Sequence, residues 1–146
     1  PLHPYRRLFW GFPAPSRAHP LADGDLIRTP RYTFQVLFTP GHSPDHLCLY
    51  EASQGWLFTG DLYVGGSDRA LRQGQDIWQT VASLERMRAL PLHALFPGSA
   101  RVRQDPLPEI ERKIAYYRAQ GAQARETLKG MEEALVKVGV MRQPGP

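Results

Sequence analysis

Over residues 33–39 the apolar Phe34, Val36 and Phe38 alternate with Gln35, Leu37 and Thr39, and this stretch is rich in the aromatic and branched side chains that favour β-strands. Runs of the same character follow at 46–51 and 55–59, and the connection between them has hairpin length, with Gly55 where a positive φ is wanted. Before them, residues 21–27 predict a turn that leads into a further short strand. The pattern therefore indicates several short strands in succession.

The apolar spacing changes to a helical period after these strands. Residues 76–90 place their apolar side chains mainly on one face, with Asp76 as the N-cap, and Pro91 ends the predicted helix. A short buried strand is predicted at 94–96. The last third of the chain is helical by pattern, and we expect Gly121 to interrupt it. Its apolar positions are Leu107, Ile110, Ile114, Tyr117, Ala124, Leu128, Met131, Leu135 and Val138.

These elements predict an α/β fold in one domain, because 146 residues suit a single hydrophobic core. Residues 1–32 contain six prolines and predict a connecting segment, in which residues 5–10 form at most a short helical turn. A segment of this kind is an unusual start for a complete domain. We therefore expect residues 33–146 to be the C-terminal half of a larger domain, and the chain to be a fragment.

Composition narrows the classes of partner. Hydrophobic residues make up 42% and charged residues 22%, and the net charge of +4 comes from scattered arginines, so a nucleic-acid partner is not expected. No segment approaches the roughly 18 apolar residues of a membrane span, so a membrane partner is not expected either. The single cysteine, Cys48, excludes an internal disulfide, indicates a cytoplasmic location and is expected to be a small buried hydrophobe.

Two of the predicted strands end in residues that can bind a metal. The strand at 33–39 stops at Pro40-Gly41, and His42, Asp45 and His46 follow within five residues. The strand at 55–59 runs into Gly60 and delivers a carboxylate, Asp61, at its end. Loops at strand ends are where α/β folds usually hold their chemistry, so both loops are candidates for a functional site.

These two pieces resemble the metallo-β-lactamase superfamily. Thr39-Pro40-Gly41-His42, followed about twenty residues later by Phe58-Thr59-Gly60-Asp61, is similar to the third and fourth metal-binding motifs of that family. The resemblance implies an αββα sandwich that holds one or two metal ions, usually zinc. The family's first motif, H-x-H-x-D-H, does not occur in this chain, and Ser99 stands where the last histidine ligand would fall.

The resemblance also implies a role for each residue. His42 would be a metal ligand, and Asp61 would be both a bridging ligand and the catalytic carboxylate. His46 would support the site rather than bind the metal, because the first histidine of the motif is the ligand. Asp45 would either orient an imidazole or lie exposed in the turn. The hydroxyl of Ser99 is a poor zinc ligand compared with imidazole.

By resemblance, the expected function is hydrolysis of a small-molecule ester or thioester by metal-bound hydroxide, as in glyoxalase-II-like enzymes. Two ligands do not make a zinc site, so we expect the isolated chain to bind zinc weakly or not at all and to show little or no turnover. The alternative is a non-catalytic half domain that acts as a binding or assembly module. Either a second copy or a missing N-terminal half would then cover its open sheet face.

Overall fold

The structure, a computed structural model, describes residues 18–65 and 74–138. The expected helical turn at 5–10 and the centre of the loop after Asp61 lie outside these ranges. The strands are β1 (Leu26–Arg28), β2 (Thr33–Phe38), β3 (Leu47–Glu51), β4 (Trp56–Gly60) and β5 (Ala94–Pro97), and the helices are α2 (Ile77–Arg88) and α3 (Leu107–Lys137). The predicted strands therefore differ from the observed ones by at most one residue at either end.

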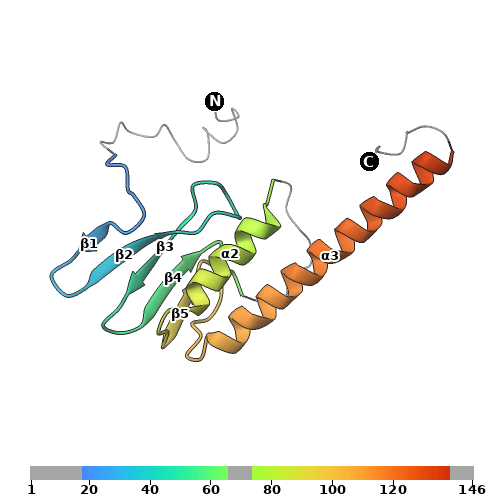
Figure 1. Ribbon diagram of the computed structural model, residues 1–146. Helices are drawn as coiled ribbons and strands as arrows, with labels where there is room; N and C mark the ends of the chain where they lie inside the picture. Colours follow the sequence, from blue (N-terminus) through green and yellow to red (C-terminus); the bar gives the residue numbers. More distant parts are fainter. Residues whose placement is uncertain (1–17, 66–73, 139–146) are drawn as a thin grey trace, which may run out of the picture.

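The strands of the described residues form one five-stranded sheet in the order β1-β2-β3-β4-β5 (Figure 1). The first four strands are antiparallel neighbours, and β5 pairs with β4 in parallel after the chain has crossed over through α2. The sheet starts at Leu26, inside the predicted connecting segment, while the domain boundary at residue 32 stays a prediction. The expected α/β class is confirmed by this arrangement.

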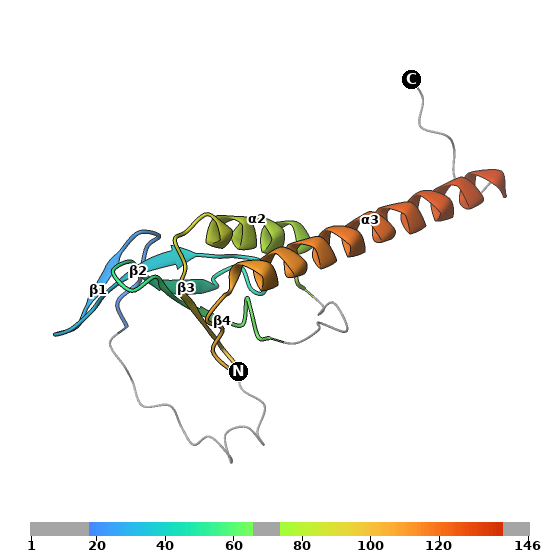
Figure 2. The ribbon, with the colours of Figure 1, turned by 90° about the horizontal axis from the view of Figure 1, so that it is seen from below.

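Helices α2 and α3 lie on the same face of the sheet (Figure 2). The strand side chains that point to them share the period of two, and the helices add their own apolar faces. The resulting core contains Leu37, Cys48, Tyr50, Leu57 and Leu95 from the sheet, with Val81, Leu84, Met87, Ile110 and Ile114 from the helices. In β2 the core-facing residue is Leu37, whereas Phe34 of the alternating set lies on the opposite face, so the helices pack on the face that the alternation leaves mostly polar.

The opposite face of the sheet carries a row of aromatic side chains, which we call the aromatic face. It consists of Tyr32, Phe34, Trp56, Phe58 and Phe96. Their rings pack on one another across the strands, and the closest pair, Phe58 and Phe96, is stacked with centroids 4.4 Å apart. In the described residues no helix covers this face, and its side chains are only partly buried. A sheet with apolar side chains on both faces is typical of an inner layer.

Helix α2 begins as the sequence predicts. Asp76 is its N-cap, and the side chain of Asp76 accepts hydrogen bonds from the backbone N–H groups of Trp78 and Gln79, each at 2.9 Å. The helix ends at Arg88 rather than at residue 90, because Ala89 already forms the C-cap. This correction is small and leaves the predicted apolar face unchanged.

The predicted interruption at Gly121 is wrong, because α3 is one continuous helix from Leu107 to Lys137. The reason for the glycine is a close approach between helices. A Cβ at position 121 would lie 2.8 Å from Cζ2 of Trp78, well inside a normal contact distance. None of the helices in the described part of the chain is long and apolar enough to cross a membrane.

Gly121 and Gly130, both on α3, provide a matched test of this explanation. A methyl group added at Gly130 would meet no atom within 4 Å, so Gly130→Ala is expected to raise the free energy of unfolding by about 0.5–1 kcal/mol through helix propensity. Gly121→Ala should not raise the free energy of unfolding in this way, because its methyl group would clash with Trp78. Thermal or urea unfolding of both variants checks the difference, and equal stabilisation would contradict the close approach.

Candidate metal centre

His42 and Asp61 meet at one edge of the sheet, although 19 positions separate them in the sequence. His42 follows β2 and Asp61 follows β4, and their Nε2 and Oδ2 atoms lie 3.5 Å apart. The His42 side chain is 23% exposed and the Asp61 side chain is 57% exposed, so both remain open to solvent. The separation is longer than the ~2.7–3.2 Å of an ordinary N–H···O hydrogen bond. The two side chains therefore face a common space and do not form an ordinary hydrogen bond with each other.

The turn that carries His42 is held by α2 and its N-cap. The backbone N–H of Asp76 donates to the carbonyl of Gly41 at 3.0 Å, and the Ser83 hydroxyl donates to the carbonyl of Pro40 at 2.7 Å. Gly41 has a φ of +138°, and a Cβ there would lie 2.5 Å from the backbone nitrogen of Thr80. The turn can therefore pass this close to the helix only with glycine at position 41.

The loop that carries Asp61 is held by the end of β5. Gly60 has a φ of +49°, which turns the chain sharply after β4. The Gly98 N–H donates to the Gly60 carbonyl at 2.9 Å, and a Cβ on Gly98 would lie only 2.6 Å from that carbonyl oxygen. The Pro97–Gly98 segment thus passes directly beside Asp61, and its glycine makes that approach possible.

His46 lies beneath the same two loops. Its ring centroid is 6.0 Å from that of His42, and its Nδ1 shares a hydrogen bond of 2.9 Å with Thr39 Oγ1. A Cβ on Gly60 would lie 3.0 Å from its Nε2, so the imidazole also packs against the second loop. Burial lowers the pKa of His46, and the neighbouring His42 lowers it further. Both effects favour the neutral form of this imidazole.

The buried threonines at the two strand ends are a part of the site that the motif reading did not single out. Thr39 is fully buried and links His46 Nδ1 to Cys48 Sγ, which lies 3.2 Å from its hydroxyl. Thr59 is also fully buried and donates to the carbonyl of Tyr63 at 3.0 Å. Each threonine lies at the end of its strand, with its side chain on the core-facing side, and a turn that contains glycine follows it. That repeated position is the sequence signal that could have found them.

The remaining predicted site residues lie at the edge of this group. Asp45 is exposed, and its Oδ1 accepts a hydrogen bond of 2.7 Å from Ser43 Oγ, which lowers the pKa of its carboxyl group. Ser99 is also exposed and directly follows Gly98, the residue that passes beside Asp61. The structure thus brings His42, His46 and Asp61 together and leaves Asp45 bonded within its own turn.

Cys48 gives this region a predicted alkaline sensitivity. Burial raises the pKa of the Cys48 thiol to about 11 from 9.0. The unfolded chain therefore loses this proton at a lower pH than the folded chain, and stability contributed by the thiol is lost as the pH rises from about 9 to 11. Over that interval the free energy of unfolding should fall by roughly 2–3 kcal/mol more in the natural protein than in Cys48→Ala.

Urea unfolding of both proteins at several pH values measures this difference. Groups other than Cys48 titrate in both proteins and cancel in the comparison. Parallel pH curves for the two proteins would contradict the prediction.

The donor chemistry at this edge suits part of a metal site. Two ligands at ~2.0–2.1 Å from a tetrahedral zinc ion lie roughly 3.3 Å apart, which is close to the observed 3.5 Å between His42 and Asp61. A catalytic zinc ion normally has three protein ligands. Within residues 18–65 and 74–138, no group of three or more His, Cys, Asp or Glu side chains could hold a metal ion. The described residues alone therefore do not complete a site.

Comparison with known proteins identifies the family. The family model described as "Metallo-beta-lactamase superfamily" matches residues 2–99. The chain therefore belongs to the metallo-beta-lactamase superfamily, as its two strand-end motifs predict.

Among curated relatives, "Beta-lactamase-like protein 2 homolog" of Drosophila melanogaster is 31% identical over 68% of this chain and 32% of its own length. "Hydroxyacylglutathione hydrolase" of Hydrogenovibrio crunogenus is 38% identical over 49% of this chain and 26% of its own length. "Atrochrysone carboxyl ACP thioesterase" of Aspergillus fumigatus is 28% identical over 70% of this chain and 31% of its own length. The chain thus spans about a third of these relatives or less.

Solved structures agree with the fold. A metallo-beta-lactamase family protein of Thermus thermophilus aligns with a TM-score of 0.64 at 22% identity, over 82% of this chain and 41% of that one. The protein TTHA1623, solved in a di-iron-bound form, aligns with a TM-score of 0.54 at 34% identity, over 72% of this chain and 54% of that one. The sheet and helices described above therefore correspond to part of the larger fold, and a member of the family binds metal ions.

Proposed function

We propose that this chain contributes to a metal-dependent hydrolase that cleaves small-molecule esters or thioesters. The observation that carries the proposal is the approach of His42 to Asp61 at 3.5 Å across two separate strand-end loops. An imidazole and a carboxylate held this way, and left open to solvent, suit a shared cation better than a structural ion pair. The relatives named as a hydroxyacylglutathione hydrolase and a thioesterase support the choice of substrate class.

In this proposal His42 and Asp61 are two of the protein ligands, and the rest come from chain outside the described residues. A bound divalent ion would supply a water nucleophile of lowered pKa. His46 and Thr39 keep the loop of His42 in place through their hydrogen bond of 2.9 Å. Gly98 keeps the loop of Asp61 in place through its bond to Gly60. The ion is expected to be zinc, and the di-iron form of TTHA1623 makes iron the second metal to analyse.

The proposal is tested on the protein expressed from its complete natural reading frame. We expect a stoichiometric metal content by elemental analysis, turnover of an S-acyl thioester and an aryl ester, and loss of both activities on treatment with a chelator. Re-addition of the metal should restore them. A bis-aryl phosphodiester assayed in parallel should be turned over far more slowly, and the reverse preference would overturn the substrate class.

A non-catalytic binding or assembly module is the second candidate. The described residues lack a group of three side chains that could hold a metal, and Ser99 carries a hydroxyl at the last motif; both observations favour this candidate. In this case the complete protein would contain no stoichiometric metal and would hydrolyse neither ester. The aromatic face would then be the surface that a partner covers, because its five aromatic side chains are only partly buried and no helix of the described residues lies on them.

A further inference from the structure

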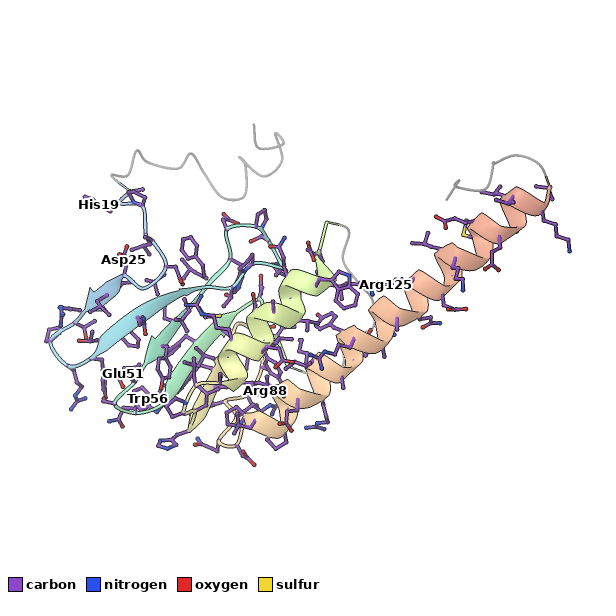
Figure 3. All side chains as sticks on the ribbon, viewed as in Figure 1. His19, Asp25, Glu51, Trp56, Arg88 and Arg125 are labelled. Atoms are coloured by element: carbon purple, nitrogen blue, oxygen red, sulfur yellow. The ribbon has the colours of Figure 1, made fainter. Side chains whose placement is uncertain are left out.

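The C-terminal half of α3 extends away from the rest of the domain (Figures 1 and 2). The buried residues of α3 end at Gly121, where Trp78 packs against the helix and Arg125 stacks on the Trp78 ring at 4.3 Å. Figure 3 shows Arg125 where α3 passes the start of α2. Residues 122–138 continue beyond this point for about 25 Å, at ~1.5 Å per residue.

The apolar spacing of α3 does not stop where the domain ends. From Ile110 onward, the intervals between apolar or small positions alternate between four and three residues. The positions are Ile110, Ile114, Tyr117, Gly121, Ala124, Leu128, Met131, Leu135 and Val138. An average interval of 3.5 residues sustained over four heptads is the pattern of a coiled-coil seam. The first part of this seam packs on α2 and the sheet.

The second part of the seam is open to solvent. Leu128, Met131, Leu135 and Val138 are 59%, 57%, 36% and 70% exposed, and we call these four residues the α3 seam. A solitary helix of this length is marginal in water, because most helix stability in proteins comes from packing of the apolar face. A row of large apolar side chains along such a helix therefore indicates that another surface covers it.

The residues beside the α3 seam indicate what that surface is. One flank carries opposite charges at Arg125 and Glu132, and the other flank carries the small residues Thr127 and Ala134. In an antiparallel pair of identical helices, like flanks face each other. Arg125, which stacks on Trp78 of its own domain, then also lies beside Glu132 of the other copy, and the two small flanks meet and allow close approach. A parallel pair would bring no opposite charges together.

The position of the folded domain favours the same orientation. Trp78 and α2 already cover the seam at Gly121, so a parallel partner would bring a second domain to the end of the helix that is occupied. In the antiparallel orientation the two domains lie at opposite ends. Leu128 of one copy then packs beside Met131 of the other, and the overlap extends along the whole of residues 122–138.

We propose that α3 binds α3 of a second copy of this chain in an antiparallel pair, with the α3 seam at its centre. The proposal is independent of the hydrolase activity. Two helices of this length bury less than the ~1,600 Å² of a standard interface, so the dimer should be weak and reversible, with a dissociation constant in the micromolar range. Its twofold axis passes between Leu128 and Met131.

Sedimentation velocity of the protein expressed from its complete natural reading frame, over a range of concentrations, tests the surface. We expect a monomer–dimer equilibrium that Leu128→Glu shifts to monomer by at least about a hundredfold in concentration, because a charge enters the seam. Gln123→Glu is the matched control, since it adds the same charge on an exposed position away from the seam. A monomer at all concentrations, or a dimer that Leu128→Glu leaves intact, would overturn the proposal.

A charge exchange tests the orientation. Arg125→Glu and Glu132→Arg should each weaken self-association by about tenfold, because like charges then face each other. An equimolar mixture of the two variants should dimerise as the natural protein does. In a heterodimer, position 125 of each copy again faces the opposite charge at position 132 of the other. The double variant should also self-associate normally. If neither mixing nor the double variant restores association, the antiparallel pairing is wrong.

Discussion

Replacing His42 by Ala, or Asp61 by Asn, is expected to abolish metal-dependent hydrolysis by the complete protein and to lower its metal content. Each change removes one donor of a pair whose atoms lie 3.5 Å apart, and neither change enlarges a buried cavity, because both side chains are partly open to solvent. Loss of a residue that merely supports a ligand typically costs about 10–100-fold, so loss of a ligand itself should exceed this range. Elemental analysis and steady-state kinetics measure both effects.

Matched controls separate this prediction from a general effect of substitution. His19→Ala removes an exposed imidazole remote from the site, and Asp45→Asn neutralises an exposed carboxylate in the same turn as His42. Both should retain metal and most of the activity. The ligand assignment would fail if His42→Ala kept a full complement of metal, or if Asp45→Asn were as damaging as Asp61→Asn.

The second large effect is expected from Gly41→Ala, which should lower the free energy of unfolding by about 3 kcal/mol or more. A side chain at a φ of +138° is strained, which costs about 1–3 kcal/mol. The new methyl group would also lie 2.5 Å from the Thr80 nitrogen and 2.6 Å from its Cα, so helix α2 would have to move. Overpacking against backbone adds roughly 1–3 kcal/mol.

Gly24→Ala provides the control for Gly41→Ala. Gly24 also has a positive φ, +89°, but no atom lies within 4 Å of the position a Cβ would take. Only the conformational cost applies there, about 1–2 kcal/mol. Urea unfolding of the two variants isolates the contact with Thr80 as the difference. Equal losses would mean that backbone conformation alone requires glycine at position 41.

The aromatic face and the α3 seam are separate apolar surfaces, and each is expected to be covered by a different partner. Both are apolar surfaces, but the aromatic face spans the sheet at Phe34, Phe58 and Phe96, whereas the α3 seam lies on the helix that leaves the domain. The αββα sandwich implied by the resemblance contains a second sheet, which would cover the aromatic face in a complete domain. The α3 seam instead has the spacing and flanking charges of a self-complementary helix. Variants in the seam should therefore leave metal content unchanged.

Local sequence determined the elements and their ends. Short runs rich in aromatic and branched side chains predicted strands that agree with the observed ones to within a residue, although apolar side chains occupy both faces of the sheet. Asp76 predicted the start of α2 because its carboxylate satisfies backbone N–H groups that the helix leaves open. The Thr-Pro-Gly-His and Thr-Gly-Asp segments predicted the family, and the match over residues 2–99 confirms it.

Only the tertiary structure decided which residues distant in the sequence are in contact. That His42 comes within 3.5 Å of Asp61 depends on the pairing of β2, β3 and β4, which no local pattern contains. Gly121 has a low helix propensity and predicts a break, yet α3 continues because Trp78 needs the space that a side chain would fill. Propensity is a property of a few neighbouring residues, whereas close approach depends on segments brought together by the core. The sequence alone therefore determined the pieces of the site, and packing determined their contact.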